Sequence, residues 1–342
     1  MTHPFRVSAA QLCTALLSLT CSASLWAADI SPLKFDGQIR NNSLALSPDE
    51  STAVVSYSER SELLVYDLKK GELRQTLPGY ITPRNIVFAP DGKSFYVSDS
   101  SLGEVIKTNT ATLQIQSRIA AGPGAFGTAI SKDGQNLYLN NQASNTVTRF
   151  DTGSGLARSV ITGFAQPRQG VKLSPDGSKL YVTNFLGDKV TIVDTKTDKI
   201  EGEIKDFSKI RAISISADGK TLFAANSGTH TLAVVDIAKR EIQNLVSVGR
   251  EPYGAALSPD GRFIYAGNLA DQTVSVVDVA SQQLVATITG FKQPRQAIAF
   301  TRDGKLAYVL NEDLSIAKVD RDSQKIVQQI TAAPKNKSAP LF

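Results

Sequence analysis

The chain has 342 residues, of which 42% are hydrophobic and 20% charged, and its formal net charge is +5 at pH 7. This composition is typical of a globular protein and argues against a disordered, collagen-like or multi-span membrane protein. With only two histidines, two cysteines and one methionine, the chain is poor in the ligands that imidazole or sulfur metal centres need, so we predict neither a metal nor a cofactor.

Residues 1–28 are predicted to be a secretory signal peptide that is removed. Arg6 precedes a short apolar run from Ala9 to Leu19, and the small residues Ala27 and Ala28 provide a cleavage site. A lipoprotein signal ending at Cys21 is the alternative. Both cysteines lie in this segment, so we expect the mature chain to form no disulfide.

After the predicted signal peptide, a turn motif recurs along the rest of the chain. Its constant period predicts a repeat architecture. The motif has Ser or a similar residue, a variable residue that is often Pro, then Asp and usually Gly, which together favour a tight turn. The seven Asp residues are 42 or 43 positions apart and are Asp49, Asp91, Asp133, Asp176, Asp218, Asp260 and Asp303. In the first copy Glu50 replaces Gly, so we expect that turn to be less regular.

Each repeat contains four short β-rich runs and no stretch with helical periodicity. An aromatic or apolar run follows the turn, and the third run ends at Asp67, Asn109, Asp151, Asp194, Asp236, Asp278 or Asp320. We interpret these residues as turn caps and not as catalytic carboxylates. Seven such units predict an all-β fold, a seven-bladed β-propeller of four-stranded antiparallel blades, over residues 29–333. Residues 334–342 are predicted to be a loose tail. Lys34 to Gly37 resemble the end of a fourth strand, and the sequence leaves open whether they add to the last blade.

Within the fourth repeat, Tyr181-Val182-Thr183-Asn184 follows Ser174-Pro175-Asp176-Gly177. On these residues the chain resembles the YVTN-repeat β-propeller family, and with its signal peptide it is most similar to the YncE-type periplasmic members. The resemblance implies a periplasmic binding protein, and the YncE type is associated with single-stranded DNA.

The links between repeats carry a second pattern. Three of them read Tyr80-Ile81-Thr82-Pro83-Arg84, Phe164-Ala165-Gln166-Pro167-Arg168 and Phe291-Lys292-Gln293-Pro294-Arg295, and a looser copy joins Phe207 to Arg211. Each Arg directly precedes the predicted innermost strand, so we expect the four guanidinium groups to meet at the mouth of the central channel. Guanidinium groups bind phosphate and carboxylate well.

We therefore predict a ligand site made of Arg84, Arg168, Arg211 and Arg295, with Phe185, Phe164, Phe291 and Tyr80 as aromatic contacts. Two alternatives stay open. The link aromatics can pack between blades, and the arginines can pair with the loop acids Glu59, Asp99 or Glu312. No catalytic residue is assigned, because His230 is the only histidine outside the signal and the channel strands offer no recurrent His or Glu.

Three functions are compatible with this pattern. The first is non-catalytic binding of an anionic ligand, with single-stranded DNA as the leading candidate. The second is a scaffold that docks a protein of the cell envelope. The third is a propeller enzyme such as a lactonase, which requires an acid and a base in the channel.

Overall fold

The computed structural model describes residues 39–333. The predicted signal peptide, the segment from Lys34 to Gly37 and the predicted tail lie outside these residues. Among the described residues, no helix is long and apolar enough to span a membrane.

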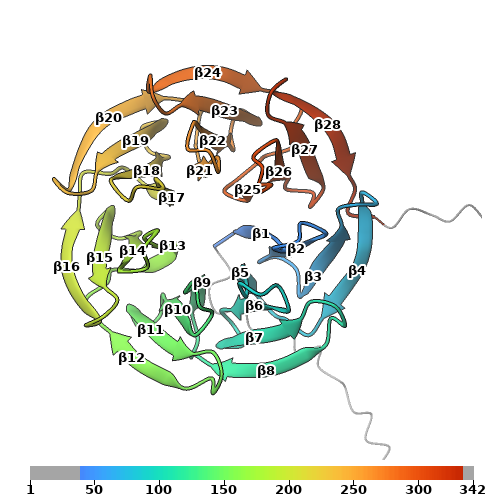
Figure 1. The fold of residues 1–342 in the computed structure, drawn as a ribbon, viewed down its shortest axis with the longest axis vertical. Coiled ribbons are helices and arrows are strands. Elements are labelled where there is room, and N and C mark those ends of the chain that lie inside the picture. The colour runs from blue at the N-terminus through green and yellow to red at the C-terminus, as the bar shows by residue number, and fades with distance from the viewer. Residues whose placement is uncertain (1–38, 334–342) are drawn as a thin grey trace, which may run out of the picture. The chain divides into compact units, whose positions relative to one another are not determined.

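Residues 39–333 form a seven-bladed β-propeller, and each blade is one continuous stretch of chain (Figure 1). Blade 1 contains β1 (Asn42–Leu46), β2 (Thr52–Tyr57), β3 (Glu62–Asp67) and β4 (Glu72–Pro78). Blade 2 contains β5 (Pro83–Phe88), β6 (Ser94–Asp99), β7 (Glu104–Asn109) and β8 (Ile115–Ala120). Blade 3 contains β9 (Ala125–Ile130), β10 (Asn136–Asn141), β11 (Thr146–Asp151) and β12 (Ala157–Ile161). Blade 4 contains β13 (Pro167–Leu173), β14 (Lys179–Asn184), β15 (Lys189–Asp194) and β16 (Lys199–Ile204).

The remaining three blades follow the same plan. Blade 5 contains β17 (Ile210–Ile215), β18 (Thr221–Asn226), β19 (Thr231–Asp236) and β20 (Glu241–Ser247). Blade 6 contains β21 (Ala256–Leu257), β22 (Phe263–Asn268), β23 (Thr273–Asp278) and β24 (Gln283–Ile288). Blade 7 contains β25 (Ile298–Phe300), β26 (Leu306–Leu310), β27 (Ile316–Asp320) and β28 (Lys325–Ile330). In every blade, neighbouring strands in the sequence are neighbours in the sheet, so the predicted fold is confirmed.

The core lies between the blades. Side chains alternate along a strand, and in β2 the two alternating sets belong to two different clusters. Val54 packs with residues of blade 2, whereas Ala53 and Val55 pack with residues of blade 7. Because each blade is covered on both faces, its second strand is buried along almost its whole length, as in β2 and β6.

The recurrent turns are built as their residues predict. In the fourth blade, Ser174 Oγ donates to Asp176 Oδ1 at 2.5 Å, and Asp176 accepts the backbone N–H of Ser178 at 3.0 Å. The first turn is regular despite its missing glycine, because Glu50 adopts the left-handed conformation with φ of 58°. Its backbone N–H donates to Ser47 O at 2.8 Å, and its side chain accepts the N–H of Arg302, which offsets the conformational cost.

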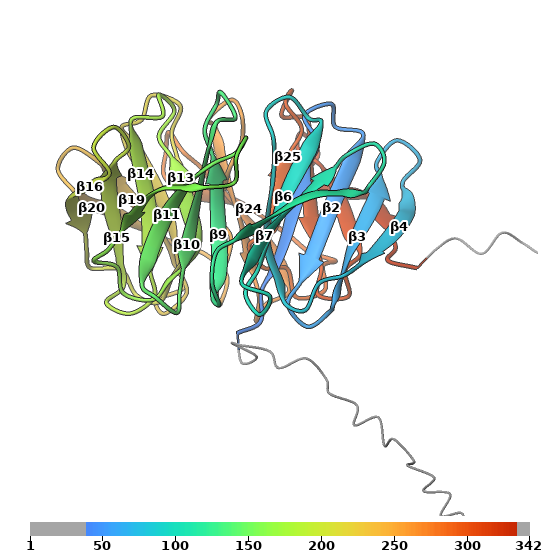
Figure 2. The same ribbon diagram turned by 90° about the horizontal axis from the view of Figure 1, so that it is seen from below.

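The ring is closed between blades 7 and 1 without exchange of a strand among the described residues. A cluster that includes Tyr66, Tyr308 and Leu310 fills this junction, and Tyr66 Oη donates to Leu314 O at 2.5 Å. The strands run between the two faces of the propeller and the connecting loops gather on those faces (Figure 2). The links with arginine join an outermost strand to the next innermost strand and therefore lie at one mouth of the central channel.

Candidate functional site: the channel mouth

The innermost strands surround the propeller axis (Figure 1), and in blades 2 to 7 the chain carries a cationic or aromatic residue just ahead of this strand or at its start. Going round from blade 2 to blade 7, these side chains alternate between cationic and aromatic in most positions. They are Arg84, Phe126, Arg168, Arg211, Tyr253 and Arg295. We call this set the mouth ring. The residues of the ring differ in burial, and this decides what each of them can do.

Arg84 is fully buried, with 0% of its surface exposed. Its guanidinium group donates from Nη1 to Ile39 O at 2.6 Å and to Asn41 Oδ1 at 2.5 Å, and from Nε to Ser100 Oγ at 2.9 Å. It also lies over the ring of Phe126, 4.7 Å from its centroid. Asp99 is one of the loop acids that the sequence offers as partners for the arginines. Its carboxylate instead accepts the backbone N–H groups of Ile81 and Thr82. Arg84 therefore joins blades 1, 2 and 3 and does not reach the channel.

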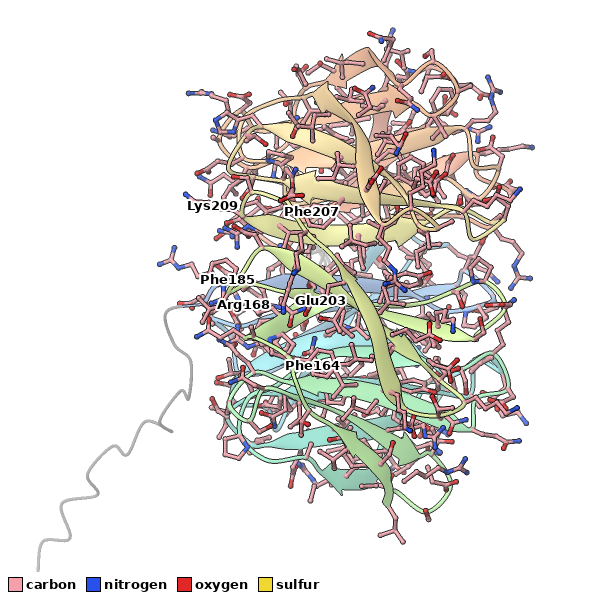
Figure 3. The ribbon with its side chains drawn as sticks, turned by 90° about the vertical axis from the view of Figure 1, so that its left-hand side faces the viewer. Phe164, Arg168, Phe185, Glu203, Phe207 and Lys209 are labelled. Atoms are coloured by element: carbon pink, nitrogen blue, oxygen red, sulfur yellow. The ribbon has the colours of Figure 1, made fainter. Side chains whose placement is uncertain are left out.

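Arg168 and Arg211 line the channel and share one aromatic partner. Their guanidinium groups lie over the ring of Phe185, at 3.6 Å and 5.2 Å from its centroid. Figure 3 shows Arg168 and Phe185 together at one edge of the propeller, with Phe164 and Phe207 farther from that edge. Because cation–π contacts orient guanidinium groups, Phe185 holds two positive charges of different blades close together.

The ring continues through Tyr253 to Arg295. Arg211 and Arg295 lie over the Tyr253 ring at 4.6 Å and 5.5 Å. Arg295 is only 8% exposed, and its Nε donates to Glu312 Oε2 at 2.9 Å. The second oxygen of Glu312 accepts the Tyr57 hydroxyl at 2.6 Å, and burial together with this hydrogen bond raises the pKa of Tyr57 to about 12. The carboxylate pairing considered for the arginines thus holds for Arg295.

The mouth opens into a cavity of about 780 Å³ that follows the channel. Among the described residues that line it, every charged side chain is cationic: Arg40, Arg168, Lys172 and Arg211. Most of the remaining wall is apolar, with a few neutral polar groups such as Asn85, Thr128 and Ser214. Because like charges repel strongly where water is scarce, this arrangement favours a bound anion.

The link aromatics lie elsewhere. Tyr80, Phe164, Phe207 and Phe291 are buried, each in a cluster between two blades, and none of them lines the cavity. This is the interblade packing that the sequence left open as an alternative. We therefore do not include Tyr80, Phe164 or Phe291 in the site.

Three side chains of the mouth and channel were missed from the sequence. Phe126 and Tyr253 take the place of the arginine in blades 3 and 6, and neither they nor Lys172 belong to the site predicted from the sequence. The alternation of cation and aromatic ring could have been found by aligning the residue seven or eight positions before each turn Asp. Lys172 could have been found as the one basic residue four positions before such an Asp.

Within residues 39–333, no cluster of three or more His, Cys, Asp or Glu side chains could hold a metal ion. His230 is exposed in the loop between β18 and β19, where its Nδ1 accepts the backbone N–H of Glu251 at 3.2 Å.

Comparison with known proteins agrees with this architecture. A search of curated proteins found no match. Among solved structures, Kuenenia stuttgartiensis hydrazine synthase is similar, with a TM-score of 0.73 and 19% sequence identity over 81% of this chain and 94% of that chain. At this identity the similarity concerns the fold alone. The family model described as Lactonase, 7-bladed beta-propeller matches residues 42–210 and 194–295. The chain therefore belongs to the lactonase family of seven-bladed β-propellers.

Proposed function

We propose that this protein binds an anionic ligand at the channel mouth and does not itself catalyse a reaction. The observation that carries the proposal is the exclusively cationic set of charged side chains along the described channel wall, with Arg168 and Arg211 held side by side on Phe185. Fixed guanidinium groups bind phosphate and carboxylate through paired hydrogen bonds. The site takes up the ligand from the periplasm, as the signal-peptide pattern and the YVTN-type resemblance indicate.

Single-stranded DNA is the polymer that we propose as ligand. Proteins that bind single strands combine cationic side chains with flat surfaces on which bases stack. In the mouth ring one such surface is the Arg168 guanidinium group, which covers Phe185 at 3.6 Å, since bases stack on guanidinium planes as well as on aromatic rings. The resemblance to YncE-type proteins supports the same ligand.

Fluorescence anisotropy with a labelled oligothymidylate tests this proposal. We expect the logarithm of the association constant to fall linearly with the logarithm of salt concentration, and the slope to decrease by about 1.4 in an Arg168→Ala/Arg211→Ala variant, which is about 0.7 for each lost phosphate contact. The matched control is Arg74→Ala/Arg118→Ala, which removes the same charge from the exposed strands β4 and β8. An equal loss in both variants would reduce the binding to general charge attraction and refute the site.

Membership of the lactonase family favours hydrolysis of a lactone as the second candidate. A hydrolase needs a base to activate water, and among the described lining residues the only side chain that can serve as one is the Lys172 amine. Lactone turnover by the purified protein that is lost in Lys172→Met and kept in Lys199→Met would support this candidate over binding alone.

A further inference from the structure

Lys172 is the exception among the inner strands. It lies four positions before the turn Asp of blade 4, and the equivalent positions of the other blades hold small or apolar residues: Ala45, Val87, Ala129, Ser214, Ala256 and Ala299. Lys172 lines the same cavity as Arg168 and Arg211 but lies deeper in the channel, near the other end of β13. It thus introduces one positive charge into the interior of an otherwise neutral channel segment.

Nothing in the described part of the chain neutralises this charge. The Lys172 side chain makes no hydrogen bond or ion pair with any other side chain that the structure describes, whereas other lysines of the same blade do, such as Lys179 with Asp194 at 2.9 Å and Glu201 at 2.6 Å. Water of the channel reaches the side chain, but the blades enclose it, and this loss of solvent lowers the pKa of its ammonium group. An exposed ammonium group in a channel whose described lining has no acidic side chain attracts an anion from the channel water.

The spacing between the two cationic points follows from the strand register. In blade 4, Pro167 pairs with Asn184 and Lys172 pairs with Tyr181, with a bulge between them. Lys172 and the residue next to Arg168 are therefore separated by the length of three residues on the regular strand β14, which is roughly 10 Å. The wall around this segment is largely apolar and includes Val87, Ile130, Ile213 and Leu257.

We propose that Lys172 binds the second anionic group of an elongated small molecule whose first anionic group is held by Arg168 and Arg211. This inference rests on the anion site proposed above and gives that site a small-molecule ligand in addition to the oligonucleotide. The ligand is anionic at both ends, and its middle is apolar because the channel wall between the two cationic points offers mostly hydrocarbon. α,ω-Dicarboxylates are the simplest molecules of this class, and an extended chain of eight methylene groups is of the required length.

Isothermal titration calorimetry with sebacate, the ten-carbon dicarboxylate, and decanoate, which has the same length but one carboxylate, tests the inference. We expect wild-type protein to bind sebacate at least tenfold more tightly than decanoate, and Lys172→Met to abolish that difference. Lys199→Met, which removes an exposed lysine on the outer strand β16, should leave it unchanged. As a second readout, the NMR titration of reductively ¹³C-methylated Lys172 should show a pKa below the ordinary lysine value that rises when sebacate binds.

The outcomes separate this inference from the function on which it rests. The role of Lys172 is refuted if sebacate binds no more tightly than decanoate. It is also refuted if Lys172→Met leaves sebacate binding unchanged while Arg168→Ala/Arg211→Ala abolishes that binding. In both cases the anion site at the mouth stands. If Arg168→Ala/Arg211→Ala changes the binding of neither the dicarboxylate nor the oligonucleotide, the proposed function itself fails.

Discussion

At the scale of single residues, the arginines of the mouth ring have the same place in the repeat but different surroundings. Arg84 satisfies its donors inside the protein and has no exposed surface. Arg211 donates from Nε to Ser227 Oγ at 3.1 Å, and its guanidinium group lies over two aromatic rings at the channel. A buried, hydrogen-bonded charge is a structural element, whereas a partly exposed charge on an aromatic ring is available to a ligand.

This contrast predicts opposite effects of the same substitution. Arg84→Met should lower the free energy of unfolding by about 3 kcal/mol, because buried acceptors lose their donor. Arg211→Met should cost less than about 1 kcal/mol, since it removes partly exposed cation–π contacts with two rings and a hydrogen bond, and should weaken anion binding instead. Urea unfolding followed by circular dichroism measures both. Equal losses of stability would contradict the assignment of Arg84 to the interblade core.

The repeat pattern predicts where the arginines lie in the sequence of each blade, but it does not predict which of them are buried. The positions of Arg84 and Arg211 in the repeat are identical, seven residues before the turn Asp. What separates them is the neighbour from another blade: Phe126 and Asn41 cover Arg84, whereas Arg211 faces the cavity. Contacts between residues more than 40 positions apart have no local signature, so only the folded chain reveals them.

At the scale of elements, the recurrent turn is stabilised by its ionised Asp. The hydroxyl of the turn Ser or Thr and a backbone N–H donate to the carboxylate, and this lowers the pKa of Asp133, Asp176, Asp218 and Asp303. For Asp176 the value falls from 3.8 to about 2. A carboxyl group whose pKa is lower in the folded state contributes stability above its unfolded pKa and loses it as the pH falls through the folded value.

We therefore expect the melting temperature to fall between pH 3.8 and about 2, the window set by Asp176, with contributions from every such turn. An Asp176→Asn/Asp218→Asn variant should be less stable than wild type at pH 6, because a neutral amide accepts these hydrogen bonds less strongly. The difference should shrink on acidification, since the wild-type carboxylates become neutral too. Differential scanning fluorimetry from pH 6 to pH 2.5 checks this, and parallel curves for the two proteins would contradict it.

At the scale of the whole propeller, closure of the ring is non-covalent. Blade 7 takes all four of its strands from residues 298–330, so side chains across the junction with blade 1 hold the ring shut. They include the Tyr66 hydroxyl on Leu314 O and the Arg302 guanidinium on Pro48 O at 3.1 Å.

Two tyrosines offer a matched test of closure. Tyr66→Phe removes a buried donor that joins blade 1 to blade 7, and we expect a loss of about 1 kcal/mol. Tyr265→Phe removes a buried hydroxyl that has no hydrogen-bonding partner among residues 39–333, so we expect stability to stay unchanged or to increase. Chemical denaturation of the two variants compares them directly. A larger loss for Tyr265→Phe would show that closure does not depend on the Tyr66 bond.

The amino-acid sequence by itself determined the number of blades, the four strands of each, the turns that join them and the links that end in arginine. These features follow from local rules, because turn residues and alternating apolar runs act over a few positions and repeat seven times. Only the tertiary structure decided which arginines face the channel, that Phe126 and Tyr253 complete the mouth ring, and that the link aromatics are buried. It also placed Lys172 inside the channel. These features depend on which side chains of different blades meet, and the packing of the closed ring settles that.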